Sequence, residues 1–288
     1  MFLFLVLLRA GAESGAYSGA LIGGRVSPQF PTRANVPSAT LNHPVYPYLL
    51  HAGHLSLPTF GVLAACGLML ALALSQRTAH LAHISPDALW DAGLFAILAA
   101  FILSRLLLIV EHLRTFISFP ILLLTVPSLT ATGLLLTAIA TLLWLRWKRI
   151  PILPALDAWA PCATLVWAFL ALGHFAEGSD PGLPTTLPIG IHMPGESAPL
   201  HPVALYAAII ALTLTASLLF ALQRHRKPGE TAAIALIAIG TAQFLLSFLR
   251  QPGLEAIAGL DQLQLVALAM IVAGCALWLA AWSTIKVG

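Results

Sequence analysis

The chain has 288 residues, of which 59% are hydrophobic and only 9% are charged, and its mean hydropathy is +0.91. These values lie far outside the range of soluble globular proteins and predict an all-α integral membrane protein. The net charge of +3 does not indicate nucleic-acid binding, because the basic residues cluster in short segments between apolar runs. The three cysteines each lie alone in an apolar segment, so we expect no disulfide, no metal site and no cofactor.

The first part of the chain is expected to lie outside the membrane-spanning domain. Residues 1–8 are apolar but too short to cross a bilayer. Residues 9–48 are rich in Gly, Ser, Ala and Pro and show no helical period. We therefore expect a mobile or surface-associated segment at 1–56 and a transmembrane domain at 57–288.

Seven apolar runs follow, and each is close to the roughly 20 residues that span a bilayer. They cover residues 58–74, 89–110, 129–145, 155–175, 202–222, 231–249 and 260–281. Because no polar surface is left to cover such runs in a soluble fold, we expect about seven transmembrane helices.

The loops between these runs predict the orientation. If the helices alternate in direction, the basic residues of the loops fall on one side; they are Arg77, the basic runs at 146–149 and 224–227, and Lys286. The positive-inside rule makes this side cytoplasmic, which places the N-terminus outside and the C-terminus inside. The long polar loop between the fourth and fifth helices is then expected at the periplasmic face of a bacterial inner membrane.

This polar stretch, residues 170–206, holds most of the side chains that could carry chemistry. Hydrocarbon solvates ionisable side chains poorly, so such residues gather at cavities and interfaces. The candidates are His174, Glu177, Asp180, His201 and Tyr206. Each also has a structural interpretation, as an interfacial side chain, a solvated loop residue, a helix cap or an aromatic-belt residue.

Two arginines, Arg105 and Arg250, are predicted near the outer leaflet. A planar guanidinium offers several donors suited to a phosphodiester, so both are candidates for binding a lipid phosphate. A structural ion pair or a headgroup anchor is the alternative for each.

The segment His201-Pro202-Val203-Ala204-Leu205-Tyr206 resembles the His-Pro-x-x-Leu-Tyr signature of the bacterial prolipoprotein diacylglyceryl transferases. The resemblance covers roughly residues 58–281. Further matches are Arg105, the segments at 156–161, 228–230 and 248–252, and the glycines Gly173, Gly178 and Gly182. The resemblance implies a seven-helix inner-membrane enzyme with an outer N-terminus.

It also implies a reaction that belongs to lipoprotein biosynthesis. The diacylglyceryl group of phosphatidylglycerol moves to the lipobox cysteine thiol of a preprolipoprotein, giving a thioether and releasing glycerol 1-phosphate. A thiol is mostly protonated at neutral pH, so the transfer needs a base or a positive field, and the leaving phosphate needs donors. The expected partners are thus phosphatidylglycerol, lipobox segments and membrane lipids, with Arg250, Arg105, Gly173, Gly178 and Gly182 at the lipid.

The chain departs from the family pattern at several charged positions. The family's Gly-Arg-x-Gly is Leu170-Ala171-Leu172-Gly173 here, its Asn-Phe is His174-Phe175, and its Arg-Phe-x-x-Glu is Gln243-Phe244-Leu245-Leu246-Ser247. One hypothesis is an enzyme in which His174, Glu177, Asp180 and His201 replace the lost groups. The alternative is a catalytically impaired paralogue that binds membrane lipid or acts as a scaffold. A transporter is less favoured, because the sequence has no inverted repeat.

Among the replacement groups, His201 is the favoured base. It opens a helix, one turn from Tyr206, whereas Glu177 and Asp180 lie on a loop rich in Gly and Pro that is expected to hold side chains less firmly.

Overall fold

The computed structural model describes residues 48–52, 55–113, 131–192, 198–224, 227–251, 255–257 and 259–283. Most of the N-terminal segment expected at 1–56 and the basic residue Lys286 lie outside the described residues. Just before the first described helix, β1 (Tyr48–Ala52) and β2 (Leu55–Pro58) pair as an antiparallel hairpin.

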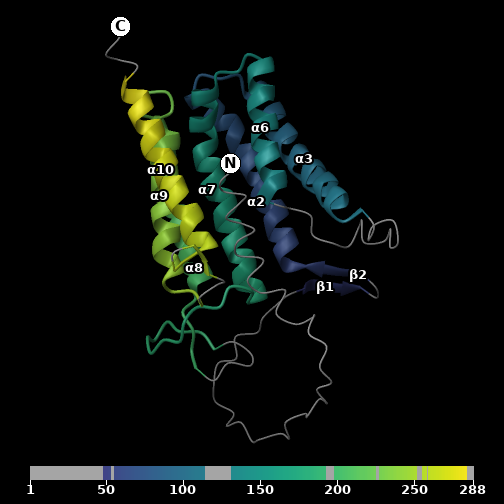
Figure 1. Ribbon diagram of the computed structural model, residues 1–288, viewed down its shortest axis with the longest axis vertical. Helices are drawn as coiled ribbons and strands as arrows, with labels where there is room; N and C mark the ends of the chain where they lie inside the picture. The colour runs from purple at the N-terminus through teal and green to yellow at the C-terminus, as the bar shows by residue number, and fades with distance from the viewer. Residues whose placement is uncertain are drawn as a thin grey trace, which may run out of the picture.

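Seven long helices make up most of the described part of the chain, which confirms the prediction of an all-α membrane protein (Figure 1). They are α2 (Thr59–Leu81), α3 (Pro86–Glu111), α6 (Ala131–Trp147), α7 (Ile152–Glu177), α8 (Val203–Leu222), α9 (Glu230–Ser247) and α10 (Gln262–Ser283). A second small pair of strands, β3 (Glu255–Ile257) and β4 (Leu260–Asp261), precedes α10. Six of the helices are long and apolar enough to cross a membrane, and α6 is shorter, so the chain is a multi-pass membrane protein.

The helix ends differ from the predicted ones mainly in α2. The apolar run predicts an end at residue 74, but the helix continues to Leu81. Ser75 and Thr78 are buried there, and their hydroxyls donate to backbone carbonyls of the preceding turn. These bonds satisfy the hydroxyl groups within the helix, so polar side chains do not end it.

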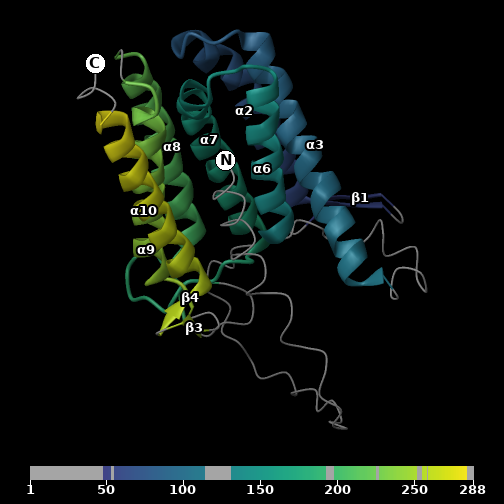
Figure 2. The same ribbon diagram turned by 45° about the horizontal axis from the view of Figure 1, so that its top comes forward.

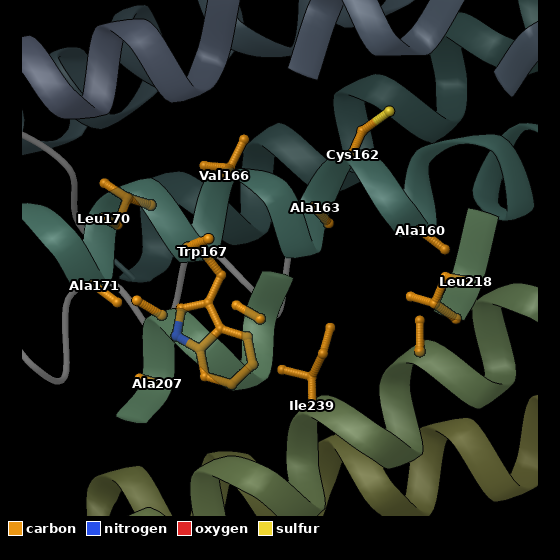
Figure 3. Close-up of a cluster of buried hydrophobic side chains, with 14 of the residues drawn as sticks. Ala160, Cys162, Ala163, Val166, Trp167, Leu170, Ala171, Ala207, Leu218 and Ile239 are labelled. Atoms are coloured by element: carbon orange, nitrogen blue, oxygen red, sulfur yellow. The ribbon is translucent and has the colours of Figure 1, made fainter. Parts of the chain in front are cut away.

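Helix α7 lies at the centre of the bundle. Figures 1 and 2 show α8, α9 and α10 on one side of it and α2, α3 and α6 on the other. Its buried residues include many alanines, and the indole of Trp167 fills the space between α7, Ala207 of α8 and Ile239 of α9 (Figure 3). Small side chains let helix backbones approach closely, as is typical of membrane bundles. The core therefore fixes α7 and α9 side by side.

A buried carboxylate links the N-terminal part of α7 to the N-terminus of α9. Asp157 of α7 accepts hydrogen bonds from the backbone N–H groups of Gly229, at 2.6 Å, and Ala232, at 2.8 Å. Gly229 precedes α9 and has a φ of +90°, a backbone conformation that residues with a side chain rarely adopt. Asp157 thus caps the N-terminus of α9 from a neighbouring helix, where a negative charge is favourable.

Replacing Asp157 with alanine is expected to destabilise the protein by about 1–3 kcal/mol, because two buried backbone donors lose their acceptor. Thermal unfolding of the purified protein in one detergent measures the effect. Asp91→Ala is the matched control, since Asp91 is exposed on α3. Equal unfolding temperatures for the two variants would contradict this role of Asp157.

Candidate functional site

One end of the bundle gathers most of the candidate residues. Helix α7 ends there at Glu177, α8 begins at Val203, and α9 ends at Ser247 (Figures 1 and 2). The polar loop after α7 crosses this end, so segments far apart in the sequence meet. The structure therefore places His174, Asp180, His201, Tyr206 and Arg250 in one region.

Backbone hydrogen bonds hold the loop between the start of α8 and the exit of α9. The N–H of Leu183 donates to the carbonyl of Leu249 at 2.8 Å, and the N–H of His201 donates to the carbonyl of Leu183 at 3.0 Å. Gly182 forms a bridge with Arg250, and a Cβ on it would collide with His201. Glycine at 182 therefore serves the close packing of three segments.

The strongest polar contact of the site joins the loop to α9. Nη2 of Arg250 lies 2.9 Å from Oδ2 of Asp180, and the two side chains are only 15% and 11% exposed. A buried ion pair of this geometry keeps both charges in place. The structure thus holds Asp180 more firmly than its Gly/Pro-rich neighbourhood predicts. Nε of Arg250 is buried and has no hydrogen-bond partner among the described residues, so one guanidinium donor is left for a ligand.

His174 lies beside this pair, in the last turn of α7. Its Nδ1 and the hydroxyl of Ser179 are 2.8 Å apart, and its ring packs against Phe60 of α2 with centroids 4.8 Å apart. It interacts electrostatically with both Asp180 and Arg250. The Ser179 hydroxyl can accept from Nδ1–H or donate to Nδ1, and in the tautomer in which it accepts, Nε2 is the ring nitrogen that can take up a proton.

Gly178 makes this contact possible. It ends α7 in the left-handed conformation, with a φ of +67°, and turns the chain so that the N–H of Ser179 donates to the carbonyl of His174. Ser179 is the residue that the sequence does not single out. Its spacing of five residues from His174, directly after a helix-ending glycine, is the signal that could have found it.

His201 and Tyr206 form a looser pair. Nδ1 of His201 and the Tyr206 hydroxyl are 3.5 Å apart, at the long limit for a hydrogen bond, and the ring centroids are 6.2 Å apart. Both side chains are partly buried. The contact predicted from their spacing is therefore present, but it holds the His201 ring less tightly than Ser179 holds His174.

Three candidates have other surroundings. The Glu177 carboxylate accepts a hydrogen bond from the backbone N–H of Phe60, in the first turn of α2. A Cβ on Gly173 would lie 2.7 Å from the Phe60 ring, so this glycine lets α2 and α7 approach. Arg105 is partly buried on α3, which packs against α2 and α6, away from α9 (Figures 1 and 2). The structure does not bring Arg105 to Arg250.

In the described part of the chain, no group of three or more His, Cys, Asp or Glu side chains could hold a metal ion. What the arrangement offers is a cation with a free donor, a carboxylate that orients it, and a histidine whose ring is held by a hydrogen bond at Nδ1. Such a set can bind a phosphate and accept a proton close to it.

The sequence of the chain is similar to those of one family of known proteins. Residues 47–280 match the family model described as prolipoprotein diacylglyceryl transferase. The phosphatidylglycerol–prolipoprotein diacylglyceryl transferase of Clostridium tetani is 25% identical over 235 residues, which cover 79% of this chain and 94% of that protein. The enzyme of the same name from Synechococcus elongatus is 28% identical over 225 residues, 72% of this chain and 78% of that protein. The one from Bordetella parapertussis is 33% identical over 154 residues, 51% and 58% of the two chains. The chain belongs to the prolipoprotein diacylglyceryl transferase family.

Proposed function

We propose that this protein transfers the diacylglyceryl group of phosphatidylglycerol to the lipobox cysteine of a preprolipoprotein, at the outer face of a bacterial inner membrane. The observation that carries the proposal is the Arg250–Asp180 ion pair beside His174, at one end of a membrane bundle. Family membership and the names of the relatives support the same reaction.

The reaction has simple requirements. The thiol gives up its proton, the sulfur attacks the glyceryl carbon that carries the phosphate, and the carbon–oxygen bond to phosphate breaks. A thioether forms, and glycerol 1-phosphate leaves with the electron pair. The enzyme must therefore accept a proton at the sulfur and stabilise negative charge on the leaving phosphate.

Residues of this chain meet both requirements. Arg250 offers its free Nε–H to a phosphate oxygen, while Asp180 holds the guanidinium in place. His174 accepts the thiol proton at Nε2 in the tautomer in which the Ser179 hydroxyl accepts from Nδ1–H. His201 and Tyr206 border this region and help to position the substrates. The backbone segments around the site are held in place by Glu177 and by the glycines Gly173, Gly178 and Gly182. Arg105 contacts lipid elsewhere on the bundle.

The site lies at the outer leaflet in this proposal. At the opposite end of the described bundle lie basic residues of the ends and loops of α2, α6, α8 and α9; they are Arg77, Arg146, Lys148, Arg149, Arg224 and Lys227. Under the positive-inside rule that end is cytoplasmic. We expect a reporter fused after Gly288 to give a cytoplasmic signal, and one inserted after Pro188 a periplasmic signal. The reverse result would put the site in the wrong leaflet.

Complementation tests the function in cells. A bacterium depleted of its own diacylglyceryl transferase loses lipoprotein modification and stops growing. Expression of this chain is expected to restore both growth and lipidation, followed by the mobility and mass of a reporter lipoprotein. Membrane insertion without any restored lipidation would favour the alternative, a lipid-binding or scaffolding paralogue.

A further inference from the structure

The end of the bundle opposite the candidate site has two strained helix ends. Among the residues that the structure describes, His83 and Arg149 are the two residues other than glycine with a positive φ, at +57° and +56°. A side chain in this left-handed region crowds the backbone, so glycine usually occupies such positions. His83 lies two residues after α2 and Arg149 two residues after α6, and both helices finish at the same end of the bundle (Figures 1 and 2). A strained residue kept at such a place points to a use for its side chain.

Buried isoleucines fix the backbone turn at both helix ends. The N–H of Ile84 donates to the carbonyl of Ala79 at 2.9 Å, and the N–H of Ile150 donates to the carbonyl of Leu145 at 2.8 Å. A hydrogen bond of this span closes a Schellman motif, in which the residue before the donor takes the left-handed conformation. Ile84 and Ile150 are each 8% exposed and belong to one hydrophobic cluster. The packing therefore requires the left-handed turn but not a side chain on it, and both left-handed residues are exposed.

Arg149 is thus an arginine at a position where glycine would satisfy the fold. The helix macrodipole favours a positive charge at the C-terminus of α6, but Arg146 and Lys148 already supply two. All three cations are exposed, and none of them forms an ion pair with a carboxylate among the described residues. Three uncompensated positive charges within four residues form a surface that attracts anions.

Aromatic rings hold Lys148 and set the depth of these cations. Its Nζ lies 5.2 Å from the ring centroid of Trp144 and 5.1 Å from that of Trp147. Trp144 stacks on Phe95 of α3, with centroids 4.3 Å apart, so the ring that holds the ammonium is itself anchored between two helices. Trp147 is 72% exposed, and Leu143, one turn earlier, is 61% exposed. Exposed tryptophan above exposed leucine is typical of the boundary between headgroups and hydrocarbon, so the cations lie at headgroup level.

We propose that Arg146, Lys148 and Arg149 bind the headgroup phosphates of anionic phospholipids in the leaflet that this end of the bundle faces, which is the cytoplasmic leaflet in the orientation proposed above. The exposed cations match a negatively charged headgroup, and the tryptophans match a lipid rather than an acidic protein. This surface takes no part in the proposed transfer, since it lies at the opposite end of the bundle. Helix α6 packs extensively against α3 but only slightly against α7. A lipid bound at the end of α6 therefore stabilises a weakly held part of the bundle.

The test measures the unfolding temperature of the full chain in a nonionic detergent, with added phosphatidylserine or phosphatidylcholine. Phosphatidylserine is anionic and is not the donor lipid of the proposed reaction. It should raise the unfolding temperature of wild type by about 3 °C or more beyond phosphatidylcholine, and high salt should remove the difference. Arg149→Gly should unfold about 1–3 °C above wild type without lipid, because the backbone strain is relieved, and should gain about half as much from phosphatidylserine.

Three further variants complete the test. Arg149→Lys keeps both the charge and the strain, so it should behave like wild type. Lys148→Gln should halve the gain from phosphatidylserine even if Arg149→Gly fails to fold. Arg224→Ala removes one exposed charge at the same end of the bundle and should keep the full gain.

Three results would each overturn the proposal. The first is an equal gain from the two lipids in wild type, which would leave an acidic protein as the better partner for this surface. The second is an equal loss of the gain in Arg149→Gly and Arg224→Ala, which would show that only net charge matters. The third is an unfolding temperature of lipid-free Arg149→Gly below that of wild type, which would show that the arginine serves the fold.

Discussion

Replacing Arg250 with alanine is expected to slow transfer by about 10- to 150-fold, and replacing it with lysine by less. The range corresponds to about 1.5–3 kcal/mol for a lost hydrogen bond to a charged group. Lysine keeps the charge but not the planar fork that lets Arg250 hold Asp180 and a phosphate together. Steady-state kinetics with phosphatidylglycerol and a lipobox peptide measure the effect.

This experiment needs a control for folding, because Arg250→Ala leaves the Asp180 carboxylate buried without its partner. The double variant Arg250→Ala with Asp180→Asn removes that unpaired charge, and we expect it to regain thermal stability but not activity. Arg224→Ala, at an exposed arginine on the opposite end, should keep both. Recovery of activity in the double variant would mean that Arg250 serves only the fold.

The second large effect is expected at His174. His174→Gln should lower the transfer rate by at least about 100-fold, the contribution of a well-placed general base. His201→Gln should lower it by only about tenfold, because the 3.5 Å contact with the Tyr206 hydroxyl holds the His201 ring less tightly than the 2.8 Å contact with Ser179 holds the ring of His174. The base must reach the thiol that attacks the carbon beside the phosphate, and His174 interacts electrostatically with Arg250, the residue proposed to bind that phosphate.

Ser179 provides a finer test of the same geometry. Ser179→Ala leaves His174 in place but removes the hydrogen bond at Nδ1, so the rate should fall several-fold because the ring is held less firmly. Ser179→Thr, which retains a hydroxyl, should restore much of it. A larger loss in His201→Gln than in His174→Gln would contradict this assignment and return the role of base to His201.

The sequence predicts the fold well because membrane burial requires long apolar helices. The seven runs coincide with α2, α3, α6, α7, α8, α9 and α10, and the largest discrepancy is the extension of α2 to Leu81. Hydropathy alone could not predict that extension, since it depends on Ser75 and Thr78 bonding to their own helix. The short strands form by local backbone pairing, and the sequence contains no clear pattern that predicts them.

The sequence singles out the candidate residues but not the contacts between them. His174, Asp180, His201 and Arg250 all stand out as polar groups in an apolar chain. Asp180 and Arg250, however, are seventy positions apart, and backbone hydrogen bonds through Leu183 and Leu249 bring them together. Backbone bonds leave no residue pattern to read. The sequence predicts that Arg105 and Arg250 both lie near the outer leaflet. It does not reveal that Arg105 lies on the α3 side of the bundle, away from Arg250.

An assay of the reaction with purified protein tests most directly whether this protein transfers the diacylglyceryl group. Purified wild type, phosphatidylglycerol and a lipobox peptide are incubated together, and the peptide mass is followed. We expect a gain equal to one diacylglyceryl group on the cysteine, with release of glycerol 1-phosphate and no gain on a Cys→Ser peptide. An unchanged peptide, under conditions in which the Clostridium tetani relative modifies it, would show that this chain does not catalyse the transfer.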